Sequence, residues 1–181
     1  MKLKTYAIFA VTILVAVVLA ACSGESTNGE SASKVNDTQD IKKLVSEYSL
    51  GNIENQSASI TSQQLIVTES KKSKQVYDLP ENDFFVSIAP YINKTHPCTI
   101  HSLTGCQGEM VEEDFDVYIE DTEGNLILDE TLKSESNGFI DLWLLRDKTY
   151  HITITHDGKT VESEFSTFES DNTCITTMQL T

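Results

Sequence analysis

The chain has 181 residues, of which 28 are acidic and 13 are basic, and its formal net charge is −15 at pH 7. A surface this acidic would repel the phosphates of nucleic acids, so the composition excludes a nucleic-acid-binding function and favours interaction with cations. The length is sufficient for one domain of ordinary size or for two small domains.

The N-terminus predicts an exported, lipid-anchored protein. The basic start MKLK precedes the apolar run TYAIFAVTILVAVVL and the sequence LAAC. This is the pattern of a lipoprotein signal peptide over residues 1–21, with cleavage before Cys22 and attachment of diacylglycerol to its thiol. A transmembrane anchor is the alternative, but the apolar run is shorter than the roughly 20 residues that span a bilayer. Cleavage removes Lys2 and Lys4 and takes the net charge from −15 to −17.

A flexible tether and an N-terminal region follow the leader. Residues 22–39 are small and polar, which predicts a tether without a core. Residues 40–95 are predicted to be helical at first and extended later. The first helix is indicated by apolar residues at spacings of three and four, which are Ile41, Leu44, Val45 and Tyr48. A second, short helix is expected over 58–70, where Thr61 and Gln64 have capping-box spacing, with extended chain after it.

Residues 96–181 change to a period of two, which is typical of strands. Apolar and polar side chains alternate in FDVYIED and TYHITIT, and Asn137-Gly138 and Asp157-Gly158 mark turns. Short strands at regular intervals predict a sandwich of about seven strands. The predicted fold class is α+β and mostly β, with a small helical N-terminal part followed by a C-terminal antiparallel β-sandwich.

Cysteine placement is the strongest chemical signal. The stretch THPCTIHSLTGC contains Cys98 and Cys106, and Cys174 lies far downstream. If Cys22 carries lipid, three thiols remain, and an odd number outside the cytoplasm cannot pair off completely within one chain. One thiol stays free or pairs with another chain, or all three serve a common site.

Metal binding is the preferred interpretation of these thiols. Three converging thiolates suit a soft monovalent ion, and Cu(I) accepts three sulfur ligands. Zinc would need a fourth ligand, which His101 or His96 could supply. The predicted metal ligands are therefore Cys98, Cys106 and Cys174, with His101 as an additional ligand.

Other interpretations stay open at this point. A Cys98–Cys106 disulfide could close the loop and leave Cys174 as a buried free thiol. The thiols could instead carry out thiol–disulfide exchange, although the chain lacks the C-x-x-C pattern of that chemistry. The sandwich could also belong to a structural or adhesive lipoprotein. No serine, histidine and aspartate arrangement indicates a catalytic set, so the chain is not expected to be an enzyme.

Three stretches resemble the CueP family of exported copper-binding proteins, namely FFVSIAPYINKTHPCTIHSLTGCQGEM, NGFIDLWLLRD and DNTCITTMQL. The resemblance covers residues 40–181. It implies a β-rich C-terminal domain that binds Cu(I) through three cysteines, which correspond to Cys98, Cys106 and Cys174. The lipobox departs from the family pattern and suggests tethering to a membrane instead of free diffusion.

The resemblance also implies a cellular role and partners. The family is associated with copper resistance and with supplying copper to exported enzymes such as Cu,Zn superoxide dismutase, and its members can form homodimers through the N-terminal part. The expected protein is lipid-anchored on the extracytoplasmic face of a membrane and sequesters or delivers Cu(I). A thiol reductase is an implied partner, because sulfur ligation of the metal requires reduced thiols.

Overall fold

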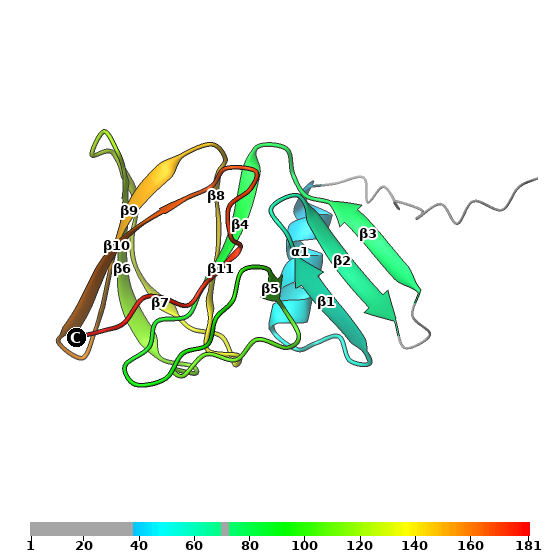
Figure 1. Cartoon of the computed structure of the whole chain (residues 1–181), viewed down its shortest axis with the longest axis horizontal. Helices are drawn as coiled ribbons and strands as arrows, with labels where there is room; N and C mark the ends of the chain where they lie inside the picture. The colour runs from blue at the N-terminus through cyan, green and yellow to red at the C-terminus, as the bar shows by residue number, and fades with distance from the viewer. Residues whose placement is uncertain (1–37, 70–72) are drawn as a thin grey trace, which may run out of the picture.

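The computed structural model describes residues 38–69 and 73–181. The predicted signal peptide, the lipid-attachment residue Cys22 and nearly all of the predicted tether lie outside these residues. The described chain contains one α-helix and eleven β-strands, arranged in three sheets (Figure 1). Within it, no helix has both the length and the apolar character needed to cross a membrane.

Helix α1 (Thr38–Ser49) is the helix predicted from the apolar spacing. Ile41, Val45 and Tyr48 are buried on one of its faces, where they pack with the first sheet. Gly51, with a φ of 73°, follows the end of the helix. Glycine reaches this left-handed conformation without steric cost, so the chain turns away sharply after the last helical turn.

The first sheet occupies the region where a second helix was expected. Thr61 and Gln64 form a tight turn, in which Thr61 N–H donates to the Gln64 carbonyl (2.9 Å) and Gln64 N–H donates to Thr61 Oγ1 (2.9 Å). The prediction of a helix over 58–70 is therefore wrong. The sheet has the order β3-β2-β1-β5 and consists of β1 (Gln56–Ile60), β2 (Gln64–Glu69), β3 (Lys74–Asp78) and β5 (His101–Ser102).

The apolar residues of this hairpin explain why strands form there. Ala58, Ile60, Leu65 and Val67 are buried and belong to one hydrophobic cluster with α1. Their positions alternate within each strand, so all four side chains reach the same face of the sheet. A helix would have placed them on two opposite sides, and only one side could have been buried against α1.

The C-terminal sandwich consists of seven strands in two sheets of the described chain, which confirms the mostly-β fold class and the predicted number of strands. One of the seven strands precedes residue 96, the predicted start of the sandwich. The outer sheet has the order β10-β9-β6-β7, and the middle sheet has the order β11-β4-β8. All pairs in the two sheets are antiparallel except β11 with β4, which are parallel. The strands are β4 (Asp83–Ile88), β6 (Asp114–Asp121), β7 (Leu126–Lys133), β8 (Ile140–Leu145), β9 (Thr149–His156), β10 (Lys159–Ser166) and β11 (Cys174–Ile175).

The middle sheet contributes to two hydrophobic cores. Phe84, Val86 and Ile88 of β4 pack with β6 and β9 in the sandwich core, whereas Phe85 on the other face packs with α1 and the first sheet. Figure 1 shows the middle sheet between the outer sheet and the helical part. Strand β4 is therefore part of the sandwich, although it comes from the N-terminal region of residues 40–95.

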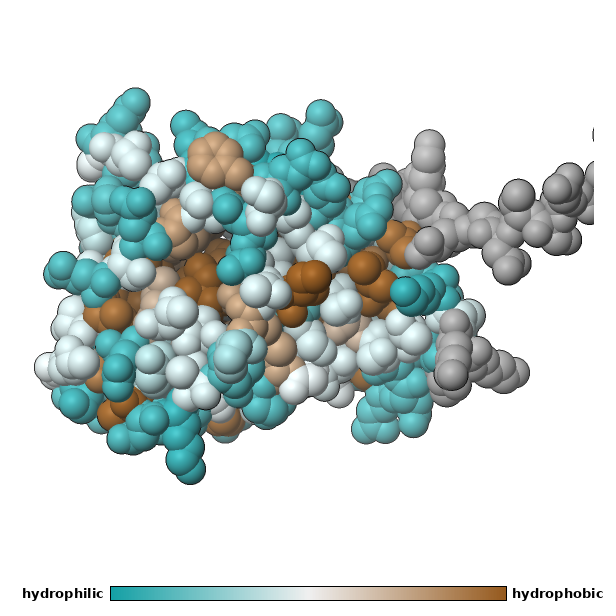
Figure 2. Space-filling view, in the orientation of Figure 1, coloured by the Kyte–Doolittle hydropathy of each residue, from teal (hydrophilic) through white to brown (hydrophobic). Residues whose placement is uncertain are grey.

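The surface seen in this orientation is mostly hydrophilic. Figure 2 shows hydrophobic residues in a broken band across the middle of this face, with hydrophilic residues on either side. The exposed large apolar side chains of residues 38–69 and 73–181 come from several separate elements, and Leu126, Leu145 and Ile100 are the most exposed among them. Scattered apolar residues are ordinary on folded proteins, so these mark no site by themselves.

Candidate metal centre

Backbone hydrogen bonds hold the cysteine loop against the final strand. Strand β5, inside the loop, pairs with β1, and β11 pairs with β4 so that Cys174 lies opposite Ser87. The Thr99 carbonyl accepts hydrogen bonds from the N–H groups of Thr173 (3.1 Å) and Cys174 (3.3 Å). The loop cysteines and Cys174, far apart in sequence, therefore lie side by side.

Four donor atoms converge where these segments meet. The Sγ atoms of Cys98, Cys106 and Cys174 and a ring nitrogen of His101 all lie within 4.8 Å of one another. Cys106 Sγ is 3.6 Å from Cys98 Sγ, and His101 Nδ1 is 3.4 Å from Cys174 Sγ. The structure thus brings together the three predicted cysteine ligands and His101. His96 is outside this group and lines a separate hollow.

Two of the three thiols are joined in this state of the chain. Cys98 and Cys174 form a disulfide with their Cα atoms 5.7 Å apart, and Cys106 is free. The alternative in which Cys98 pairs with Cys106 and Cys174 stays free is therefore wrong. The thiolate is the form of cysteine that binds metals, so metal binding by all three residues requires reduction of this disulfide.

A chain of hydrogen bonds fixes the orientation of His101. Ser87 Oγ lies 3.3 Å from His101 Nε2 and donates its single hydrogen to Asp141 Oδ1 (2.5 Å). Ser49, at the end of α1, donates to the other oxygen of the same carboxylate. Because the Ser87 hydrogen is already used, the Ser87 oxygen accepts from Nε2–H. The lone pair of the neutral imidazole is then on Nδ1, which faces Cys174.

Burial controls the charges in this chain of hydrogen bonds. His101 is fully buried, and burial lowers its pKa to about 4, with a smaller contribution from the charge of His96. The imidazole is therefore neutral at pH 7 and keeps a lone pair for a metal. Burial raises the pKa of Asp141, and the hydrogen bonds from Ser49 and Ser87 oppose that rise.

Two glycines allow the loop of Cys106 to cross the connection between β7 and β8. A Cβ atom on Gly108 would lie 2.3 Å from the Gly138 carbonyl oxygen, which is a severe clash with backbone. Gly108 N–H donates to the Asn137 carbonyl (2.7 Å), and Gly138 has a φ of 79°. The crossing therefore needs glycine on both chains, and it holds the Cys106 loop against the start of β8.

The cluster is reached from the surface through a hollow of about 220 Å³. Cys98 and Cys174 line it, together with Glu164 and Asp171 and polar residues of β10 and the final segment. Cys98 is partly exposed, whereas Cys174 is 2% exposed. The two carboxylates give the lining of the hollow a negative charge, which attracts cations.

Sequence reasoning did not identify Ser87 and Asp141 as site residues. Both are polar residues inside apolar strands, in FFVSI and FIDLWLL, and that is the available signal. Their contact joins positions 54 residues apart and depends on the pairing of β4 with β8. Spacing along the chain cannot reveal such a contact.

The chain is similar to proteins of one described family. Residues 40–179 match the family model described as periplasmic copper-binding protein CueP. A solved structure, described as the crystal structure of S.CueP, is 33% identical to this chain and aligns with a TM-score of 0.74 over 78% of this chain and 88% of that chain. Comparison with curated proteins gave no match. Because the family match spans far more than half of the sequence, the chain belongs to the CueP family of periplasmic copper-binding proteins.

Proposed function

We propose that this protein is an extracytoplasmic, lipid-anchored protein that binds one Cu(I) ion through Cys98, Cys106 and Cys174, for sequestration or for delivery to an exported copper enzyme. The observation that carries the proposal is the convergence of three sulfur atoms and one imidazole nitrogen within 4.8 Å. Membership of a family of periplasmic copper-binding proteins supports copper as the metal.

The donor set fits a soft ion. Thiolates select Cu(I) over hard cations, and neutral His101 offers Nδ1 as a further ligand beside Cys174. Zinc would use the same four donors in a tetrahedron, in which sulfur atoms are roughly 3.8 Å apart. The 3.6 Å between Cys98 Sγ and Cys106 Sγ suits either metal, so both belong in the titration.

The exposure of the three sulfurs suggests an order of release. Cys98 and Cys106 are partly exposed, whereas Cys174 is buried. A thiolate of a recipient would replace the two accessible sulfurs first and Cys174 last, with the ion passing from ligand to ligand. The proposed recipients are exported copper enzymes such as Cu,Zn superoxide dismutase, and homodimer formation through the N-terminal part belongs to the same proposal.

Thiol–disulfide exchange is the second candidate function, and the Cys98–Cys174 disulfide favours it. A dithiol reductase would supply two electrons and two protons. One of its thiolates attacks the accessible Cys98 sulfur, and Cys174 leaves as a thiolate and takes up a proton. The second thiol of the reductase then releases Cys98 as a thiol, and the reductase keeps the disulfide. For copper binding this reaction prepares the site, whereas for a redox protein it is the activity itself.

Anaerobic titration of the reduced chain with Cu(I), against a competing chelator, tests the copper proposal. We expect one Cu(I) per chain, sulfur ligation in X-ray absorption spectra, and weaker binding of Zn(II). Serine at Cys98, Cys106 or Cys174 should weaken binding by more than the roughly 10–100-fold that loss of an outer-shell partner costs. Met178→Leu is the matched control, because it removes a buried sulfur that packs in the sandwich core, and it should leave Cu(I) binding unchanged.

The results separate the candidates. Unchanged stoichiometry and affinity in Cys174→Ser would contradict the three-sulfur site. A reduced chain that binds no Cu(I) but exchanges disulfides with a test protein would support the redox candidate. A structural or adhesive lipoprotein would leave copper tolerance of its cells unchanged when all three cysteines are replaced.

The lipid anchor is a separate part of the proposal and depends on Cys22. Cys22→Ala should move the protein from the membrane fraction to the soluble fraction, because the modified thiol is lost. A Ser23→Ala variant is the control and should stay with the membrane. Equal partition of the two variants would contradict lipid anchoring without affecting the copper site.

A further inference from the structure

The hollow that leads to the Cys98–Cys174 disulfide is a route by which a thiol of another molecule can reach it. Both cysteines line this hollow of about 220 Å³, so the disulfide is open to the surface on that side. Cys98 is partly exposed, whereas Cys174 is buried. A thiol that enters from the solvent therefore meets the Cys98 sulfur before that of Cys174.

The charged residues of this hollow are all acidic. Among the described residues that line it, they are Glu164 of β10 and Asp171 in the segment before β11, and none is a lysine or an arginine. Asp171 is held in place, because its carboxylate accepts a hydrogen bond from Phe168 N–H (2.7 Å). Glu164 pairs with the imidazole of His151 (3.6 Å), but both side chains are exposed, and an exposed pair contributes little. Both carboxylates therefore act on whatever enters the hollow.

This negative charge opposes the reaction that opens a disulfide. The attacking species is a thiolate, which is an anion, and two carboxylates along its path repel it. A thiolate that has positive groups beside its sulfur avoids most of this repulsion, because those groups lie against Glu164 and Asp171 as the sulfur nears Cys98. The hollow therefore favours cationic thiols over anionic ones.

Exposed apolar side chains next to the hollow favour a protein as the source of the thiol. Ile100 is 55% exposed, and its carbonyl oxygen lies 3.6 Å from Cys98 Sγ. Phe168 is 44% exposed and belongs to the turn that Asp171 closes. Protein interfaces combine large apolar side chains with charged groups around them, whereas a small thiol would use neither Ile100 nor Phe168.

We propose that a partner protein with its thiol on a positively charged surface docks at this hollow and reduces the disulfide, while anionic thiols are disfavoured. The inference rests on the proposed function, because this reduction prepares the sulfur atoms for Cu(I). The partner's thiolate attacks the Cys98 sulfur, the Cys98–Cys174 bond breaks, and Cys174 leaves as a thiolate and takes up a proton. A second thiol of the partner then releases Cys98, so the partner supplies two electrons and two protons and ends as a disulfide.

Three synthetic dithiol peptides test the charge selection, with their two cysteines flanked by lysines, by glutamines or by glutamates. Each reduces the oxidised chain from residue 23 onward with Cys106→Ser, in which Cys98 and Cys174 are the only cysteines left. Dividing each rate by the rate with 2-hydroxyethyl disulfide, a neutral compound, corrects for the intrinsic reactivity of the peptide. We expect the lysine peptide to exceed the glutamate peptide roughly tenfold at about 0.1 M ionic strength, and the ratio to approach one at about 1 M.

A double variant removes the charge of the hollow. Glu164→Gln combined with Asp171→Asn should lower the ratio of the two rates roughly threefold or more, because the repulsion of the glutamate peptide is lost. Asparagine at 171 keeps an oxygen that accepts from Phe168 N–H, and Glu164 is exposed, so the fold should be preserved.

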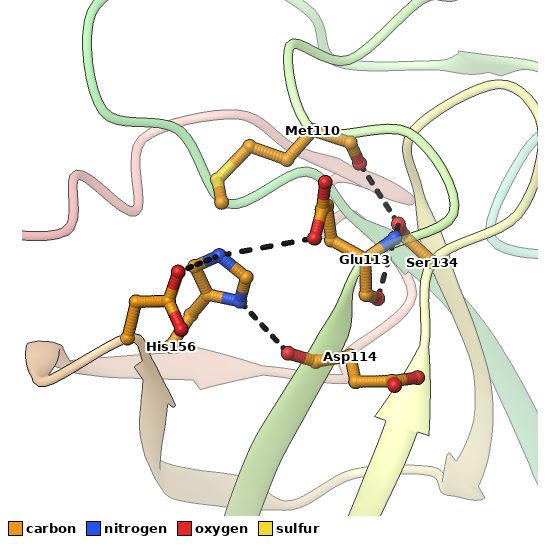
Figure 3. A network of polar contacts seen from close by, with 6 residues as sticks. Met110, Glu113, Asp114, Ser134 and His156 are labelled. Atoms are coloured by element: carbon orange, nitrogen blue, oxygen red, sulfur yellow. Dashed lines mark hydrogen bonds and ion pairs between the residues drawn. The ribbon is translucent and has the colours of Figure 1, made fainter.

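The matched control combines Glu113→Gln with Asp157→Asn, which removes the same charge elsewhere. These carboxylates also lie beside an imidazole, that of His156, and Figure 3 shows Glu113 directed toward it. His156 is five residues along β9 from His151, which pairs with Glu164 of β10, and this separation is about 16 Å. It exceeds the screening length of about 10 Å at 0.1 M salt, so the control should keep the ratio of the wild type.

Trapping identifies the sulfur that is attacked. A lysine-flanked peptide with a single cysteine should form its mixed disulfide with Cys98, and peptide mapping by mass spectrometry detects it after alkylation of the released Cys174. A mixed disulfide with Cys174, equal corrected rates for the three peptides, or equal loss of selection in the two double variants would overturn the inference.

Cu(I) titration of the reduced chain is a separate measurement. Normal Cu(I) binding without charge selection overturns this inference alone, whereas charge selection without Cu(I) binding overturns the proposed function alone.

Discussion

At the residue scale, the hydroxyl of Ser87 links His101 of the candidate metal centre to a buried carboxylate. Ser87→Ala removes the acceptor for His101 Nε2–H and the donor to Asp141. We expect Cu(I) affinity to fall roughly 10–100-fold, because the imidazole loses the bond that directs Nδ1 toward the sulfurs. Competition titration measures the change. Ser57→Ala, at an exposed position of β1, should behave as the wild type, and equal affinities in both variants would contradict the positioning role.

Asp141 should make stability depend on pH. Burial raises its pKa, and its charge raises the pKa of nearby Glu135, whose largest shift also comes from burial. A carboxyl whose pKa is higher in the folded chain contributes stability at low pH, and that contribution is lost as the pH rises through the folded-state pKa. The free energy of unfolding of the wild type should therefore fall, relative to Asp141→Asn, as the pH rises from about 4, the ordinary pKa of an aspartate, to the raised pKa of the folded chain.

Urea unfolding of the reduced, metal-free proteins at several pH values measures this difference. Glu130→Gln removes an exposed carboxylate of β7 and should keep the pH dependence of the wild type. If Asp141→Asn also keeps that dependence, the carboxyl of Asp141 does not carry the expected shift.

Residue types alone predicted three cysteines and His101 as a group, because few other residues of this chain bind soft metals. The structure brings these four side chains together. The hydrogen bonds that orient His101 were not predictable, since Ser87 and Asp141 are common residue types and belong to no recognisable motif. Their role arises only when β4 and β8 pair in the observed register.

At the scale of elements, the crossing of two loops positions Cys106. Gly108→Ala would push a Cβ atom against the Gly138 carbonyl, so the loops must separate. We expect a loss of about 1–3 kcal/mol in the free energy of unfolding, typical of overpacking, together with weaker Cu(I) binding. Urea unfolding and Cu(I) titration measure the two effects.

Gly124→Ala provides the control for this prediction. Gly124 has a φ of 82° and open space where the methyl group of alanine would lie, so alanine there causes backbone strain without a clash. It should lower stability and leave Cu(I) affinity unchanged. If Gly108→Ala also leaves the Cu(I) affinity unchanged, the crossing of the two loops does not position Cys106.

The elements themselves were predictable where periodicity was unambiguous. Helix α1 shows four apolar residues on one stripe, and the alternation in β6 and β9 marks strands. Residues 58–70 were misleading, because Thr61 and Gln64 have the same spacing in a capping box and in this tight turn. Burial against α1 decides in favour of the hairpin, and that contact lies outside any local window.

At the scale of the whole molecule, the Cys98–Cys174 disulfide joins positions 76 residues apart. Closing a loop of this length restricts the unfolded chain and should stabilise the oxidised protein by about 4 kcal/mol relative to the reduced one. Urea unfolding with and without reductant measures the difference. Cys106→Ser should keep this stabilisation, and Cys106→Ser combined with Cys174→Ser should abolish it because only one of the three thiols is left. Equal stabilities of oxidised and reduced wild type would contradict the prediction.

The disulfide between Cys98 and Cys174 could not be predicted from the positions of the cysteines along the chain. Cys98 and Cys106 are close in sequence, which favours a short disulfide on loop entropy alone. The parallel pairing of β11 with β4 places Cys174 beside Cys98 instead. Neighbouring parallel strands come from segments that are far apart in sequence, so no local sequence pattern predicts their pairing.

The position of β4 in the middle sheet limits how the protein can be shortened. A fragment that begins at residue 96 would contain both loop cysteines and Cys174 but would lack β4, the strand that lies between β11 and β8. Its β8 and β11 would have lost their hydrogen-bonding neighbour, and Phe139 and Cys174 would have lost Ala89 from their cluster. Minimal copper-binding peptides should therefore not be sought by cutting this chain at its cysteine loop.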